Sequence, residues 1–183
     1  MIIQATPYGT KKEEPFAFTY SGDFTDERVD GIGDVTLNTS GQLVTTGQTV
    51  TVSVYILSGG GGAIFSALAA TGGSGGFQTV DVELAPGTYD IVIGSGGAGL
   101  NERGSAGNGG DTSAFGQTST GGKGGSITSS GTVTPGAGGS PNGNSGKNGG
   151  LTTNLAGPSP NGGSVVNGVA QPGGNGLVRI TFS

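Results

Sequence analysis

The sequence predicts an all-β protein in which a small antiparallel β frame holds a bundle of polyglycine II helices, with no significant α-helix. Three observations lead to this prediction. Between Ser58 and Gly176, 37 of 119 residues are glycine, and many of these glycines recur at a spacing of three. Short segments of alternating apolar residues precede, interrupt and follow this tract. Apolar side chains also punctuate the tract itself, which argues against a disordered glycine-rich linker.

The glycine spacing matches a helix with three residues per turn. Rows at this spacing are Gly104, Gly107 and Gly110, and Gly143, Gly146 and Gly149. A left-handed helix of about three residues per turn places every third side chain on one face and makes no internal hydrogen bonds. Rows of glycine leave that face bare, so neighbouring backbones can approach and exchange the missing bonds. Repeated breaks in register and only 8 prolines exclude a collagen triple helix.

Composition limits the chemistry that the chain can perform. The 183 residues include no cysteine and no histidine, which excludes disulfides, thiol chemistry, the usual zinc sites and an imidazole base. The net charge is −5, yet residues 112–183 contain three cationic and no acidic residues. No basic stripe for nucleic acid is present. We therefore expect no enzyme activity, no cofactor and no bound nucleic acid.

The sequence gives expectations about location as well. No apolar run approaches the roughly 18 residues of a membrane span. Residues 1–10 lack the basic and apolar regions of a cleavable signal peptide. We expect a virion part released by lysis or an extracellular protein, and a trimmed N-terminus remains an alternative.

The chain divides into an expected N-terminal arm or linker, residues 1–14, and one glycine-rich domain, residues 15–183. The β frame is expected at 15–57, 77–94 and 177–183, with polyglycine II helices and loops at 58–76 and 95–176. Phe16, Phe18 and Tyr20 alternate and predict a half-buried first strand. The acidic segment 23–34 is either a solvated strand and turn or a calcium site. Its spacing does not match the helix-loop-helix calcium motif.

The remaining elements follow in order. Between Asp34 and Leu57, alternating apolar residues and glycine turns predict antiparallel strands. Residues 63–70 (AIFSALAA) form a helix-like piece or an apolar loop. Residues 77–93 alternate on both sides of Ala85-Pro86-Gly87 and predict a β-hairpin. No strand is expected between Gly94 and Leu177, where residues 177–182 return to close the frame.

Two motifs that suggest chemistry have simpler interpretations. Gly94–Gly99 matches the dinucleotide fingerprint G-x-G-x-x-G, but the residues that follow cannot form the helix that faces a pyrophosphate. Asp81 and Glu83 lie two apart on one strand face, which a surface strand explains better than glycosidase chemistry.

Five segments carry a resemblance to a known group. They are VYILSGGGG (Val54–Gly62), PGTYDIVIGSGGAG (Pro86–Gly99), GNGGDTSAFG (Gly107–Gly116), GGKGG (Gly121–Gly125) and PGGNGLVRITF (Pro172–Phe182). In this order and over residues 34–183, the chain resembles the glycine-rich domains of bacteriophage tail-fibre and tail-tip adhesins. The resemblance implies a stack of polyglycine II helices whose connecting loops bind the host surface. The segment Ala63–Ala70 departs from the unbroken glycine run of that group.

Loops rich in Asn, Ser, Thr and Pro are the expected binding surface, because such loops give adaptable hydrogen bonding on a rigid scaffold. The candidate ligand-binding residues are Phe65, Leu68, Asn101, Arg103, Thr128, Thr132, Asn142, Asn144, Asn154 and Asn161. The expected partners are a bacterial cell-surface polysaccharide or protein and, through the N-terminal region, other tail proteins. The alternatives are a structural tail component without receptor contact, and an ice-binding protein suggested by Thr45, Thr46, Thr49 and Thr51.

Overall fold

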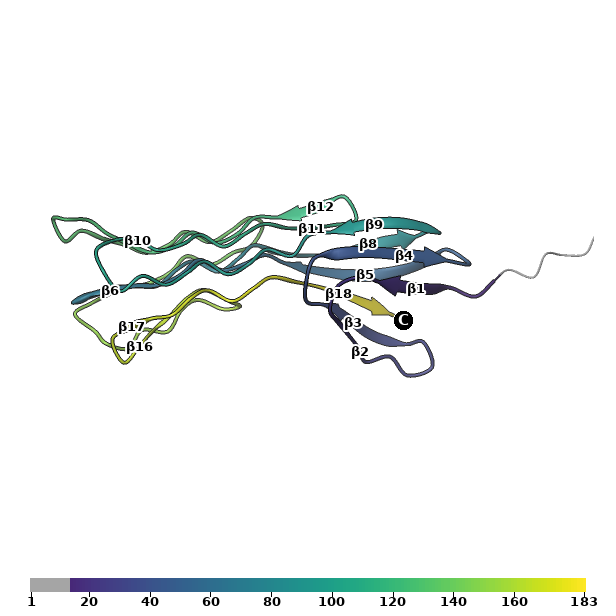
Figure 1. Cartoon of the computed structure of the whole chain (residues 1–183), viewed down its shortest axis with the longest axis horizontal. Helices are drawn as coiled ribbons and strands as arrows, with labels where there is room; N and C mark the ends of the chain where they lie inside the picture. Colours follow the sequence, from purple (N-terminus) through teal and green to yellow (C-terminus); the bar gives the residue numbers. More distant parts are fainter. Residues whose placement is uncertain (1–13) are drawn as a thin grey trace, which may run out of the picture.

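The computed structural model describes residues 14–183, so the predicted arm at residues 1–14 lies outside the described residues except for Glu14. Within residues 14–183 the protein is all-β, with 18 strands and no helix. The molecule is elongated, with the larger strands and the C-terminus at one end and the glycine-rich segments extending away from them (Figure 1). The prediction of an all-β glycine-rich protein is confirmed.

One antiparallel sheet of the frame has five strands in the order β2-β3-β18-β5-β8. Their bounds are β2 (Phe24–Asp26), β3 (Gly33–Leu37), β18 (Leu177–Phe182), β5 (Val50–Leu57) and β8 (Phe77–Leu84). The last strand pairs with both β3 and β5, so that Ile180 lies opposite Val35 on one side and Val54 on the other. As predicted, the terminal strand closes the frame.

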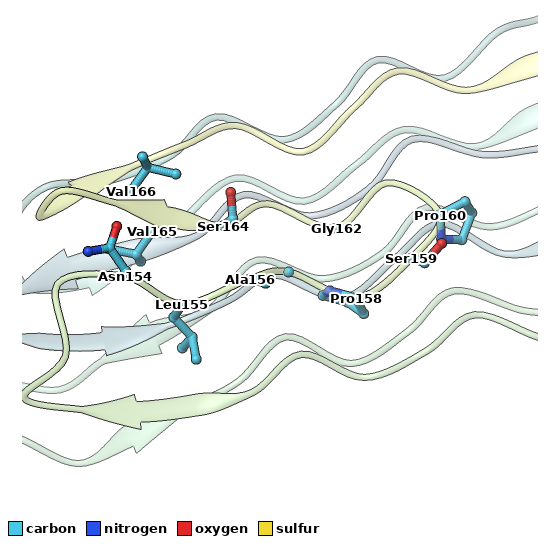
Figure 2. A pocket seen from close by; sticks show the side chains of 11 residues that line it. Asn154, Leu155, Ala156, Pro158, Ser159, Pro160, Gly162, Ser164, Val165 and Val166 are labelled. Atoms are coloured by element: carbon cyan, nitrogen blue, oxygen red, sulfur yellow. The ribbon is translucent and has the colours of Figure 1, made fainter.

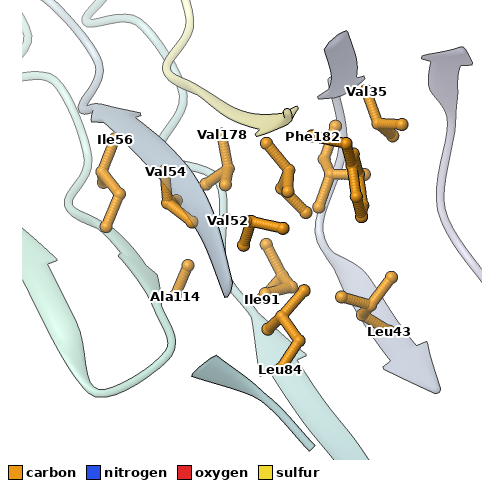
Figure 3. Close-up of a cluster of buried hydrophobic side chains, with 12 residues drawn as sticks. Val35, Leu43, Val52, Val54, Ile56, Leu84, Ile91, Ala114, Val178 and Phe182 are labelled. Carbon is orange, nitrogen blue, oxygen red and sulfur yellow. The ribbon is translucent and has the colours of Figure 1, made fainter. Parts of the chain in front are cut away.

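A second antiparallel sheet has three strands, β1 (Ala17–Tyr20), β4 (Gly41–Thr46) and β9 (Gly87–Ile91), in the order β1-β4-β9. Alternating apolar residues of both sheets meet in one core, and Leu43 and Ile91 lie beside residues of the larger sheet (Figure 3). The core side chains exposed by 1% or less include Val35, Leu37, Leu43, Val54, Ile56, Leu84, Val178 and Ile180. The period-two pattern of the sequence thus buries one face of each strand.

The predicted hairpin over residues 77–93 is wrong. Strand β8 pairs with β5 along its whole length, whereas β9 pairs with β4 in the other sheet. Residues 85–86 are therefore a corner between two sheets, and the buried Thr45 hydroxyl donates to the Ala85 carbonyl there at 2.5 Å. The alternation identified the strands correctly, but the choice of partner depends on burying Leu84 and Ile91 in the shared core.

The expectation of no strand between Gly94 and Leu177 is also wrong, because eight short strands lie there. They are β10 (Gly104–Ser105), β11 (Thr112–Ala114), β12 (Gln117–Ser119), β13 (Ser126–Ile127), β14 (Val133–Thr134), β15 (Asn148–Gly150), β16 (Val165–Val166) and β17 (Val169–Ala170). Each has only two or three residues, too few for a pattern of alternation to stand out in the sequence.

The helix-like segment is a tight hairpin. Strands β6 (Ile64–Ser66) and β7 (Leu68–Ala70) pair across Ala67, which adopts a left-handed φ of 58°. Strand β7 also pairs with β15, and Ile64 bridges to Leu100. Eight residues are too few to stabilise a helix by themselves, and these neighbours offer strand pairing instead.

The glycine-rich segments form the bundle, which comprises residues 58–63, 71–76, 94–100, 106–111, 120–125, 135–147, 156–164 and 171–176. At its centre, Gly59 and Gly62 donate to the carbonyls of Gly110 and Gly107 at 3.0 and 2.9 Å, and Gly60 and Ala63 donate to those of Gly174 and Gln171 at 2.9 and 3.0 Å. Residues three apart therefore bond the same neighbouring segment. This interval is the one expected for helices with about three residues per turn.

The central segment, residues 58–63, uses its carbonyls in the same way. Those of Gly59 and Gly62 accept from the amides of Gly122 and Gly125 at 2.9 and 3.0 Å, and those of Gly60 and Ala63 accept from Gly97 and Leu100 at 2.8 and 3.0 Å. Gly61 bonds the carbonyl of Gly73 and the amide of Gly163. The central segment is thus hydrogen-bonded to six others, and all its residues are buried.

Candidate functional site

The end of the bundle that lies farthest from the frame is called the tip and consists of residues 64–70, 101–105, 126–134, 148–155 and 165–170. The labels of β6, β10, β16 and β17 mark it at the left of Figure 1, opposite the C-terminus. Strand pairing links its parts, since β10 pairs with β13, β13 with β14, and β15 with β7. The tip is therefore a set of short hairpins on the ends of the glycine segments.

Two small apolar clusters hold the tip together. One consists of Ala63, Ala69, Val165 and Ala170, with Phe65 and Leu155 packed against it. The other consists of Ile64, Ala70, Ala106 and Ile127, with Leu68, Leu100 and Val133 packed against it. The predicted site residues Phe65 and Leu68 are thus half-buried parts of these clusters. Their packing contributes to the stability of the tip.

The polar site residues predicted on the tip support its turns. The Asn101 side-chain oxygen accepts from the Ala170 amide at 2.7 Å, and that of Asn154 accepts from the Asn167 amide at 2.9 Å. Thr128 Oγ1 accepts from the Thr132 amide at 3.0 Å. Arg103 donates from its guanidinium to the Ser129 carbonyl. Seven of the ten predicted residues therefore lie together on the tip.

The other three predicted residues, Asn142, Asn144 and Asn161, lie near the frame. The Asn142 side chain donates through Nδ2 to the Phe77 carbonyl at 2.9 Å, at the start of β8. The Asn144 side chain donates through Nδ2 to the Ser159 carbonyl at 3.0 Å. The structure therefore does not bring these three residues together with the tip.

Asn161 uses both ends of its side chain inside the bundle. Its Nδ2 donates to the Ser58 carbonyl at 2.8 Å, and its Oδ1 accepts from the Gly75 amide at 2.9 Å. It also lies 3.2 Å from the Gly174 carbonyl. The side chain replaces backbone bonds between three segments, which explains this asparagine structurally.

One groove of about 570 Å³ follows the side of the bundle from the tip (Figure 2). Its lining residues are Asn154, Leu155, Ala156, Gly157, Pro158, Ser159, Pro160, Gly162, Ser164, Val165 and Val166. Leu155 and Val165 exchange hydrogen bonds of 2.8 and 2.9 Å at one end, and Gly162 donates to Pro158 at 2.9 Å at the other. No charged side chain lines it, and Asn154 is its one predicted site residue.

A second groove, of about 360 Å³, lies on the tip beside β10 and β13. Its lining residues are Arg103, Gly104, Ser105, Ser126, Ile127, Thr128 and Ser129. Arg103 and Thr128 belong to the predicted site, whereas Ser105 and Ser126 were missed. The sequence gave no indication that these two serines lie together, because the pairing of β10 with β13 joins them from 21 residues apart.

The exposed apolar side chains were also not predicted from the sequence. On the tip, Leu151, Val166 and Val169 are exposed by 80%, 46% and 47%. At the frame end, Val29, Ile32 and Val92 are exposed by 74%, 62% and 50%. Apolar residues scattered in a glycine-rich sequence are expected to be buried, so only the structure distinguishes the exposed ones.

Two carboxylates of the acidic segment, those of Asp26 and Asp34, accept hydrogen bonds from other side chains. Arg28 donates to both carboxylate oxygens of Asp26 at 2.9 and 2.7 Å, and this hydrogen bonding lowers the pKa of Asp26. Thr181 Oγ1 donates to Asp34 at 2.7 Å. Within residues 14–183, no group of three or more His, Cys, Asp or Glu residues is placed to hold a metal ion.

Two further observations concern ice binding and membrane-spanning helices. Thr45 is buried, so the four threonines that suggested ice binding do not all share an exposed face. In the described part of the chain, no helix is long and apolar enough to cross a membrane.

Comparison with known proteins identifies the type of domain. No similar protein was found among curated sequences. A family model for a glycine-rich domain matches residues 37–182, which include most of the frame, the whole bundle and the tip. The match concerns the type of domain and carries no information about a phage tail. The chain belongs to this glycine-rich domain family.

Proposed function

We propose that this protein is the receptor-binding domain of a phage or phage-like tail adhesin, and that its tip contacts a ligand on a bacterial cell surface. The observation that carries the proposal is the arrangement of the tip. The second groove, one end of the first groove, exposed hydroxyls and exposed apolar side chains lie together at the end opposite the C-terminus. Loops on a rigid scaffold are the usual place for recognition.

The proposal includes polyglycine II conformation for the bundle segments. Its support is the interval of three residues at which the central segment bonds each neighbour. Densely hydrogen-bonded segments of this kind would hold the tip rigidly at a distance from the frame. The proposed adhesin is part of a virion or is extracellular, and its frame faces other tail proteins.

The alternative is a structural tail component without receptor contact. Val29 and Ile32 favour it, because they bridge in a hairpin at the frame end and are mostly exposed. Exposed apolar groups of this kind are suited to packing against a neighbouring protein.

The two functions are distinguished by matched surface variants. One carries Leu151→Ser, Val166→Ser and Val169→Ser on the tip, and the other carries Val29→Ser, Ile32→Ser and Val92→Ser at the frame end. Because all six side chains are exposed, each change should alter stability by less than about 0.5 kcal/mol. The fluorescently labelled protein and both variants are incubated with a panel of bacterial strains.

An adhesin predicts selective labelling of some strains that the tip variant loses and the frame variant keeps. Labelling that is lost only in the frame variant contradicts a binding role for the tip. If the folded protein labels no strain and the frame variant alone fails to co-assemble with tail proteins, the structural function is supported instead.

A further inference from the structure

Arg103 is held on the wall of the second groove with most of its hydrogen-bonding capacity unused. One guanidinium nitrogen donates to the Ser129 carbonyl on the opposite loop. A guanidinium has five N–H donors in a planar fork. Within residues 14–183 the structure gives Arg103 no other hydrogen bond and no ion pair. The fork is thus oriented by one contact and available for another.

The charges around this groove favour an anion. Residues 112–183, which supply four of the seven lining residues, contain no acidic residue. The tip has one carboxylate, that of the exposed Glu102, and it does not line the groove. A carboxylate or phosphate group would therefore meet the Arg103 guanidinium without a fixed acidic competitor in the lining. Carboxylates and phosphates are the groups that an arginine fork binds in bidentate geometry.

The rest of the lining favours a sugar over a peptide. The hydroxyls of Ser105, Ser126 and Ser129 make no hydrogen bond with other described residues. Ile127 is the one large apolar residue in the lining and is 1% exposed, so there is no apolar pocket for a peptide side chain. The volume of about 360 Å³ lies within the range of small-ligand sites.

We propose that this groove binds an acidic sugar residue of a cell-surface polysaccharide. The Arg103 guanidinium binds the acid group, and the serine hydroxyls of the groove bind the sugar hydroxyls. This inference rests on the adhesin function and specifies the class of ligand at the tip. The acid group is a carboxylate, as in a uronic acid, or a phosphate ester, since each can offer two oxygen atoms to the fork.

The test is titration of the full-length chain with three oligosaccharides of equal length: an oligoglucuronate, an oligoglucose and a phosphorylated oligoglucose. Binding is measured calorimetrically and by amide chemical shifts. The variants are Arg103→Gln, Arg103→Lys and, as a control with the same loss of charge, Lys123→Gln. Lys123 is exposed on the side of the bundle and lines neither groove.

We expect an acidic oligosaccharide to bind and the neutral one not to bind. Arg103→Gln should weaken binding about tenfold or more, as expected for loss of a charge-assisted hydrogen bond, while Lys123→Gln leaves it unchanged. Arg103→Lys should recover part of the affinity, because it keeps the charge but not the fork. The shifted amides should belong to residues 103–105 and 126–129. Carboxylate and phosphate probes identify the source of the acid group.

Several results would overturn the assignment. They are equal binding of the neutral sugar, equal loss in Lys123→Gln, and preference for a glutamate-rich peptide over both acidic sugars. Cell labelling separates this inference from the adhesin function. If Arg103→Gln labels cells as the unaltered protein does and the tip variant does not, the adhesin function stands and the anion site is wrong.

Discussion

Gly61 illustrates how tightly the backbones of the bundle pack. A Cβ atom at this position would lie 1.9 Å from the Lys123 carbonyl oxygen and 2.7 Å from the Gly124 nitrogen. The Lys123 carbonyl cannot move away freely, because it accepts from the Gly73 amide at 2.9 Å. Glycine is therefore required here for close approach and not for an unusual φ.

Replacing Gly61 by alanine should destabilise the protein by about 1–3 kcal/mol or more, the usual cost of overpacking. The matched control is Gly87→Ala, where the nearest atoms to an added Cβ are 4.0 Å away. That change should stay within about 0.5 kcal/mol. Urea unfolding of both variants measures the difference, and equal small effects would contradict the close packing of backbones.

At the scale of elements, the glycine segments depend on one another for their hydrogen bonds. An extended segment satisfies none of its own amides or carbonyls, so each glycine segment needs neighbours on several sides. Some of these backbone groups bond side chains of neighbouring segments instead. Asp111 accepts from the Gly121 amide at 2.8 Å, and Asn108 accepts from the Gly124 amide at 3.0 Å.

The Asn161 side chain also takes the place of backbone partners, because it bonds both the Ser58 carbonyl and the Gly75 amide. Asn161→Ala leaves the Ser58 carbonyl and the Gly75 amide without this partner, at a cost of about 1–3 kcal/mol. Asn38→Ala is the control, because the Asn38 side chain makes one exposed contact of 3.5 Å, from Nδ2 to the Thr36 carbonyl. Thermal unfolding should show a clear drop in Tm for the first variant alone. A similar Tm for both would argue against a structural role.

At the scale of the whole molecule, the frame continues directly into the bundle. Strand β5 ends at Leu57 and the central segment begins at Ser58, while residues 171–176 lead into β18. The central segment can lose its hydrogen bonds only if several neighbours separate from it. The frame and the interior of the bundle should therefore open together.

Amide hydrogen exchange tests this expectation. The amides of residues 59–63 are buried and bonded, so they should exchange only through global unfolding and with the same free energy as the amides of β5. Ser129 and Ser130 are exposed, and their amides make no hydrogen bond with other described residues, so they should exchange fastest. Exchange of residues 59–63 at the rate of the tip loops would show that the bundle opens independently.

The sequence by itself determined the local features of the protein. Alternating apolar residues located the frame strands, including residues 177–182, because one face of a strand must be buried. The rows of glycine predicted close contact of backbones, and a Cβ atom added at Gly107 would lie 2.6 Å from the Ala98 nitrogen. Five of the polar residues predicted for the site, Asn101, Arg103, Thr128, Thr132 and Asn154, lie on one end of the molecule.

Only the tertiary structure decided the pairing of segments. It placed β8 and β9 in different sheets, although their sequences suggest a hairpin. It also placed the Asn161 side chain inside the bundle, where it donates to the carbonyl of Ser58, 103 residues away. The reason is physical: the period of a segment depends on its own residues, whereas the partners of its backbone groups depend on which distant segments bury apolar surface and satisfy hydrogen bonds together.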